Sequence, residues 1–192
     1  MSSFEWILLG LLLFEFLLRC ALEIHDARAF QRKPDSFALA RILPIVNDIF
    51  PPESNFSKWN ENDGAFVKAH EKAHAELHHE MVRKFFWASS LVCIALLLGA
   101  IGIPFHLNLL GLLFLFHLIF NFAKILFHFI CFAQEYEADS VAAKRLQKGV
   151  SKRAIANLMA SEFPRTRLFA YVYRTHPTAR MRDAALNRSK AH

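Results

Sequence analysis

The chain has 192 residues, of which 54% are hydrophobic, and it carries 20 phenylalanines and a formal net charge of +6. This length fits one domain, but the composition argues against an ordinary soluble one. The three cysteines lie in or beside apolar segments at no metal-ligand spacing, which argues against a disulfide framework or a cysteine-based zinc site. The basic residues are scattered along the C-terminal part, so they favour attraction to anionic lipid over nucleic-acid binding.

The apolar residues gather in three blocks, at residues 4–24, 85–103 and 107–132. Each block reaches the roughly 20 residues needed to cross about 30 Å of hydrocarbon. The first block lacks a basic leading segment and a small-residue cleavage site, which is typical of a retained anchor rather than a cleaved signal. The other two blocks, joined by IPFHLN, predict a hairpin. We therefore expect a mainly α-helical integral membrane protein with about three transmembrane helices.

The charge distribution predicts the orientation of these helices. Residues 134–192 hold twelve Lys and Arg against five acids, whereas the N-terminal tip and the hairpin loop hold no Lys or Arg. Basic flanks favour the cytoplasmic side, so we expect Met1 outside and residues 26–84 on the same side as the tail. The expected parts are an anchor (1–25), a cytoplasmic segment (26–84), a transmembrane hairpin (85–133) and a cytoplasmic helical segment (134–192). The expected location is a bacterial inner membrane.

The segments outside the apolar blocks predict further helices. One short helix is expected over residues 36–42, and another begins near Gly64 and runs without a proline straight into the second apolar block. After the third block, a continuing helix is expected to end at Gly149. Ser151 then caps a helix that runs through Met159, and a last short helix follows the turn at His176-Pro177.

The segment HEKAH, from His70 to His74, has the form HExxH. On a helix, two imidazoles four residues apart lie on one face and can reach the same metal ion. Glu71 projects beside them, where it can take a proton from a metal-activated water. A solvated helix that happens to be rich in histidine is the alternative, and we expect His78 and His79 to be surface or interfacial residues.

Two histidines leave a zinc site short of one protein ligand. Leu77 and Glu80 stand where a metzincin would have Gly and His, and the charged flanks disfavour an intramembrane protease. The segment QEYEADSVAAK offers Glu135 as the third ligand. Asp139, one helical turn later, is expected to orient a ligand histidine.

These segments together resemble one known family. HEKAH, a two-span hairpin, EYEADSVAAKRL and THPTARMRDAAL resemble the membrane zinc metalloendopeptidases of the HtpX and CAAX prenyl-protease type, over about residues 64–188. The resemblance implies a small helical zincin-like (gluzincin) cytoplasmic domain with one Zn²⁺ held by His70, His74 and Glu135. It implies Glu71 as general base and His176 as a hydrogen-bond donor to the tetrahedral intermediate.

The sequence departs from this family before the motif. Only about 38 residues separate the first apolar block from the histidine helix, and SFALARILPIVNDIF does not clearly supply the strand that pairs with substrate in relatives. Many relatives also have four spans rather than three. A partner that completes the substrate cleft is therefore one expectation.

Ionisable residues also lie within the apolar blocks. His117, Asn121, Lys124 and His128 form a single stripe of the third block, and Glu15 and Arg19 lie one turn apart in the first. Such residues face protein or water rather than lipid. They form either a polar path toward the metal or bonds between packed helices, and we favour the second reading.

Three hypotheses follow for the function. The first is a membrane-anchored zinc metalloendopeptidase that cleaves polypeptides or membrane proteins near the bilayer. The second is a zinc-binding membrane protein that cuts nothing, supported by the short segment before HExxH. The third is a metal-free membrane protein whose histidines serve a pH response.

Overall fold

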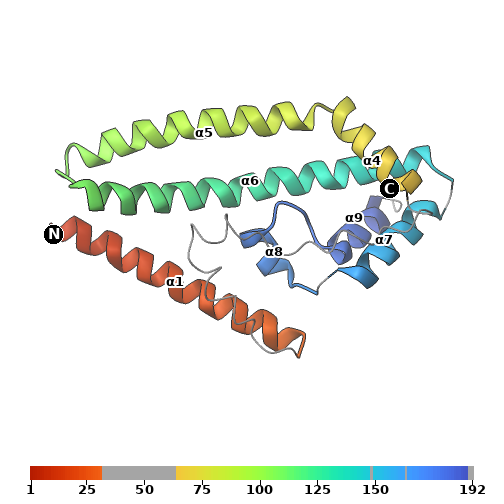
Figure 1. Ribbon diagram of the computed structural model, residues 1–192, viewed down its shortest axis with the longest axis horizontal. Helices are drawn as coiled ribbons and strands as arrows, with labels where there is room; N and C mark the ends of the chain where they lie inside the picture. The colour runs from red at the N-terminus through yellow and green to blue at the C-terminus, as the bar shows by residue number, and fades with distance from the viewer. Residues whose placement is uncertain (32–63, 148, 163, 190–192) are drawn as a thin grey trace. The chain divides into compact units, whose positions relative to one another are not determined.

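The computed structural model describes residues 1–31, 64–147, 149–162 and 164–189, and within these ranges the regular structure is entirely helical. The helices are α1 (Ser3–Ala29), α4 (Gly64–Glu76), α5 (His79–Gly102), α6 (Leu109–Arg145), α7 (Val150–Ser161), α8 (Arg167–Tyr173) and α9 (Ala179–Ser189) (Figure 1). The chain forms two compact units, Met1–Phe50 with Lys84–Phe127, and Pro51–Arg83 with His128–His192. The helix expected over residues 36–42 lies outside the described residues.

The first unit contains α1, most of α5 and the first half of α6. A capping box starts α1: the Ser2 side chain accepts from the backbone N–H of Glu5, and the Ser2 backbone N–H donates to the Glu5 carboxylate at 2.7 Å. Helices α5 and α6 pack through aromatic rings, with Trp87 against Phe120 and Phe127 at centroid distances of 5.5 and 5.1 Å. The predicted helical hairpin is confirmed.

Polar residues in this unit bond to one another between α1 and α6. Arg19 is paired with Glu15 and donates a 2.8 Å hydrogen bond to the Asn121 side-chain oxygen. Nε2 of His117 lies 3.0 Å from the Glu15 carboxylate. The expected pair of Glu15 with Arg19 is present, and these contacts favour interhelical bonding as the role of the stripe at His117 and Asn121.

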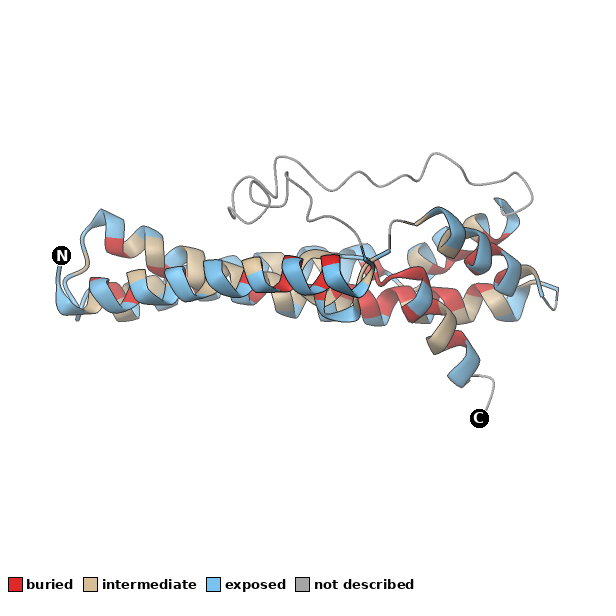
Figure 2. Ribbon diagram, turned by 90° about the horizontal axis from the view of Figure 1, so that it is seen from below, coloured by how far each residue is buried: buried red, intermediate tan, exposed pale blue. Residues whose placement is uncertain are grey.

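Among the described residues, α5 and α6 are the helices long and apolar enough to cross a membrane. Only 11% and 17% of their most apolar stretches are buried. Figure 2 colours the described residues by burial and shows the long helical part of the chain as mostly exposed or half-buried. Helix α1 is not one of the two, and it carries Glu15 and Arg19 within its apolar run. The two helices therefore present large apolar faces that the described part of the chain leaves uncovered.

The second unit has a small core of its own. Phe66 of α4 is 1% exposed and packs with residues of α6, α7 and α9, namely Ala142, Ala154, Ile155 and Leu186. A second cluster joins Phe132 of α6 to Ala170 of α8 and Met181 of α9. These clusters fix α4 and α9 on the C-terminal half of α6.

Two helix boundaries differ from the sequence prediction. Helix α6 ends at Arg145, before the predicted stop at Gly149, and α7 is capped by Gly149 rather than Ser151. Gly149 has φ 99°, a left-handed conformation that glycine adopts without strain, and Ser151 is buried within α7. Helix α8 was not predicted. The last helix after His176-Pro177 is confirmed as α9.

The histidine helix does not run straight into the second apolar block, so that prediction was wrong. Helix α4 ends at Glu76 and α5 begins at His79, with His78 between them in a left-handed conformation at φ 54°. A residue with a side chain adopts this conformation only where its surroundings hold it there. The break changes the direction of the side chains that follow the HExxH segment.

Truncation of Phe66 should destabilise the second unit. Because this ring fills the core between α4 and α7, Phe66→Ala should lower the free energy of unfolding by about 3–5 kcal/mol. Chemical denaturation followed by circular dichroism measures the change. Phe85→Ala, the same substitution at a ring that is 74% exposed, is the matched control and should cost much less. An equal loss in both variants would contradict this core assignment.

Candidate metal centre

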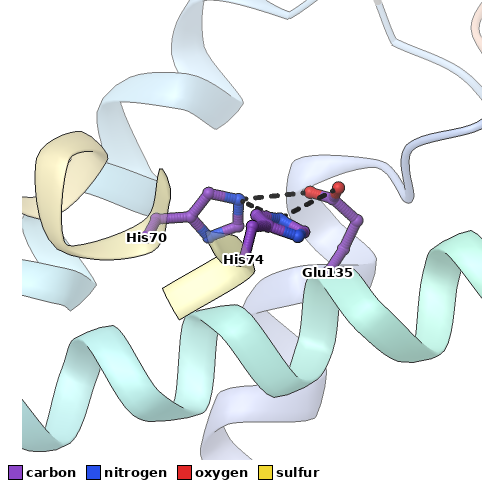
Figure 3. Close-up of side chains that lie close together, drawn as sticks. All are labelled: His70, His74 and Glu135. Atoms are coloured by element: carbon purple, nitrogen blue, oxygen red, sulfur yellow. Dashed lines mark hydrogen bonds and ion pairs between the residues drawn. The ribbon is translucent and has the colours of Figure 1, made fainter. Parts of the chain in front are cut away.

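Three side chains of the second unit converge on one point. Nε2 of His70 lies 3.0 Å from Nε2 of His74, and each of these nitrogens lies 3.4 Å from a Glu135 carboxylate oxygen (Figure 3). All the candidate ligand atoms lie within 4.8 Å of one another. Zinc–ligand bonds of about 2.0–2.1 Å in a tetrahedron place ligand atoms about 3.3 Å apart. The three residues therefore have the chemistry and spacing of a zinc site with one position left open.

The three ligands come from two helices. Helix α4 presents His70 and His74 one turn apart, and α6 presents Glu135 from its C-terminal half. His70 and Glu135 are buried, at 7% and 2% exposed, whereas His74 is half-buried. The sequence analysis expects these three residues as the metal ligands, and the structure places their candidate ligand atoms close together.

A carboxylate stands behind His70. Its Nδ1 lies 3.0 Å from the Asp139 carboxylate, on the side of the ring away from Glu135. Arg182 of α9 holds Asp139 with two hydrogen bonds, from Nε at 2.8 Å and from Nη2 at 2.5 Å. Asp139 therefore lies within hydrogen-bonding distance of one of the histidines that it is expected to orient. Arg182 was missed, because nothing in its local sequence sets it apart from the other arginines of the tail.

His79 stands behind His74. The two Nδ1 atoms lie 2.7 Å apart, and Nε2 of His79 lies 3.4 Å from the Glu137 carboxylate. His79 is 4% exposed, so the expectation that it is a surface residue was wrong, while His78 is exposed as expected. The helix break at His78 is the cause, since sequence spacing alone assumes one continuous helix.

A pocket of about 430 Å³ opens in front of the three ligands. Glu71 lines it and is exposed, and His176, from the loop between α8 and α9, reaches it with Nε2 3.5 Å from a Glu135 oxygen. Arg83 also lines it, donating to Glu135 at 3.2 Å and to Gln134 at 2.7 Å. Sequence reasoning missed Arg83 and Gln134, which were indistinguishable from other polar residues flanking the apolar blocks.

The pKa values of the centre are shifted because two buried carboxylates face histidines and arginines. Burial would raise the pKa of Glu135, but hydrogen bonds from His70 and His74 outweigh it and hold that pKa well below its usual range. Burial would likewise raise the pKa of Asp139, and Arg182 and His70 lower it. For His70, burial lowers the pKa, while Asp139 and Glu135 together raise it from 6.5 to about 9. The metal-free centre therefore carries a proton on His70 at neutral pH.

As pH rises from 6.5 to about 9, the stability of the metal-free protein and its affinity for zinc should change in opposite directions. Because the pKa of His70 is raised, its contribution to stability is present below pH 6.5 and is lost as pH rises through about 9. In the presence of chelator, the free energy of unfolding should fall by up to about 3 kcal/mol across this range. Zinc affinity should instead rise, since a metal ion must displace that proton.

Denaturation and zinc titration at several pH values measure both effects. Titration calorimetry in buffers of different ionisation enthalpy counts the released proton. His70→Gln should flatten the stability curve of the metal-free protein. A wild-type curve that stays level or rises between pH 6.5 and 9 would contradict the assignment.

Comparison with known proteins adds one match. The family model described as Peptidase family M48 matches residues 27–190, which is most of the chain. No curated protein and no solved structure matches the chain significantly.

Proposed function

The chain belongs to peptidase family M48, a family of typically zinc-dependent metallopeptidases, and on this premise we propose a membrane-anchored zinc metalloendopeptidase of the HtpX and CAAX prenyl-protease type. The observation that carries the proposal is the ligand triad of His70, His74 and Glu135, whose spacing suits one tetrahedral zinc ion with an open position. The pocket at that position supplies room for a peptide.

The side chains around the pocket have the roles that peptide hydrolysis requires. Bound zinc supplies a Lewis acid that polarises the peptide carbonyl and lowers the pKa of water. Glu71 takes a proton from the attacking water and passes it to the leaving amine. His176 donates a hydrogen bond to the oxyanion of the tetrahedral intermediate. Asp139 and Arg182 hold the His70 ring in its ligating orientation.

The membrane part of the proposal rests on exposed apolar surface. A core helix of a soluble protein buries its apolar residues, whereas α5 and α6 leave most of theirs uncovered. We place the hairpin at residues 85–133 in the bilayer and α1 as a third span. Residues 26–84 and 134–192 then lie on the cytoplasmic side, where the basic tail meets anionic lipid. Substrates are polypeptides or membrane proteins cut close to the bilayer.

Glu71→Gln should separate zinc binding from catalysis. The amide cannot accept the proton, so cleavage of casein, or self-cleavage, should fall by about 10²–10⁴-fold with one zinc per chain retained. His74→Ala and Glu135→Ala should lose the zinc itself, as read by metal analysis. Glu76→Gln, on the exposed surface of the same helix, is the matched control.

The alternatives give different results in the same assay. A wild-type protein that binds zinc and cleaves nothing supports the non-catalytic zinc protein, for which the short segment before HExxH is the main argument. A wild-type protein without zinc supports the metal-free membrane protein. Undiminished cleavage by the Glu71→Gln variant would remove the proposed general base.

Single cysteines should report the membrane orientation. With Cys20, Cys93 and Cys131 replaced by serine, a cysteine at His106 in the hairpin loop should react with an impermeant maleimide on intact cells. A cysteine at Arg188 in α9 should react only after permeabilisation. The reverse pattern would overturn the orientation, and release of the protein from membranes by alkaline carbonate would overturn the anchoring.

A further inference from the structure

We propose that His79 is a positioning residue of the metal centre, which accepts a hydrogen bond from Nδ1 of His74 and so directs the other nitrogen of that ring at the metal. The inference rests on the proposed zinc centre and extends it. It is carried by the 2.7 Å contact between the two Nδ1 atoms and by the burial of His79. His79 is not itself a ligand, because it faces the side of the His74 ring away from Glu135.

The contacts that run from Glu137 through His79 and His74 to the metal position can all be satisfied by one set of proton positions. A metal ligand needs the lone pair of His74 Nε2, so the ring proton of His74 must sit on Nδ1. Nδ1 of His79 must then accept that proton's hydrogen bond, which leaves the proton of His79 on Nε2. That N–H faces the Glu137 carboxylate at 3.4 Å, which can only accept. One assignment of protons therefore satisfies every contact from Glu137 to the metal position.

The helix break makes this contact possible. On a straight helix, residues five apart point about 140° away from each other, so His79 could not meet His74. The left-handed conformation of His78, at φ 54°, ends α4 and turns the start of α5 so that the two rings meet. The strain of a non-glycine residue in this region has a function here, because it delivers His79 to the ring it supports.

The start of α5 is held in this position from α6. Gln134 is 6% exposed and donates from Nε2 to the backbone carbonyl of His79 at 3.3 Å. Its side-chain oxygen accepts from Nε of Arg83 at 2.7 Å. A single buried amide thus fixes the first turn of α5 beside Glu135, the neighbouring residue of α6. Gln134, which holds His79 beside His74, and Glu135, the proposed third metal ligand, are therefore adjacent residues of α6.

The two ligand histidines consequently have different supports. His70 has a carboxylate directly behind it, which draws positive charge onto the ring. His74 has a neutral imidazole behind it, with a carboxylate one step further away. A neutral acceptor fixes the tautomer while adding less negative charge to the ligand.

The test compares His79→Leu with His79→Asn. Leucine fills the space but accepts no hydrogen bond, whereas the asparagine oxygen can occupy the place of Nδ1. Zinc affinity, measured by competition with a chromophoric chelator, should fall about 10–100-fold in the leucine variant and should largely recover in the asparagine variant. His106→Asn, the same change at an exposed histidine of the hairpin loop that also has a left-handed φ of 49°, should leave the affinity unchanged.

A second readout is spectroscopic and independent of affinity. In the detergent-solubilised, zinc-loaded protein, NMR should show His74 protonated on Nδ1, with that proton slow to exchange and correlated with Nδ1 of His79. In the leucine variant the same proton should exchange rapidly. Wild-type zinc affinity in the leucine variant, or an asparagine variant as weak as the leucine one, would overturn the proposal. If the leucine variant fails to fold, the tautomer of His74 in the wild-type protein and the zinc affinity of the asparagine variant still test the proposal.

The outcomes separate this inference from the proposed function. A wild-type protein that binds no zinc refutes the metallopeptidase proposal, whatever the tautomer. A wild-type protein that binds zinc through Nδ1 of His74, with the ring proton on Nε2, refutes the role of His79 alone.

Discussion

Two carboxylates buried one turn apart on α6 are the constraint on which the second unit depends. Glu135 and Asp139 are 2% and 1% exposed, and isolated charges at that depth would be costly. Cationic or hydrogen-bonding groups from the surrounding helices offset this cost: the histidines of α4, Arg182 of α9 and Arg83 of α5. The fold of the unit and the candidate metal centre are thus one arrangement, since the groups that neutralise the carboxylates of α6 include the candidate metal ligands and their neighbours.

This arrangement explains why the site needs the C-terminal helix. Arg182 reaches Asp139 only because Met181 and Leu186 anchor α9 against neighbouring helices of the unit. Asp139 in turn fixes the His70 ring, so a residue near the end of the chain determines the geometry of a ligand in α4. Metal binding would therefore be coupled to folding of the unit, because the folded core assembles the candidate ligands and an ion bound only to the folded state would stabilise it.

The sequence predicts the ligands better than it predicts their surroundings. HEKAH and EYEAD were recognisable because each places side chains one turn apart on a single helix, a relation that depends on local geometry alone. The break at His78 carries no glycine or proline, so periodicity could not show it, and with it the burial of His79 was missed. Arg182 and Gln134 act through contacts more than 40 residues away along the chain, which local pattern does not encode. Helix α8 has only seven residues, too few for a periodic pattern, although the Thr166 side chain caps its start and Ala170 packs against Phe132 of α6.

The arrangement of the pocket bears on the choice between an enzyme and a non-catalytic zinc protein. A protein that only stores or senses zinc gains from enclosing the ion with a fourth protein ligand. Here the open side of the triad faces a pocket, and the residues that line it there include a carboxylate, Glu71, and an imidazole, His176. Directly behind the two histidines, by contrast, Asp139 and His79 are buried and in contact with the histidine rings. Hydrolysis requires both residues that hold the metal ligands in place and accessible acid–base groups beside the metal position, whereas simple metal binding requires only the first.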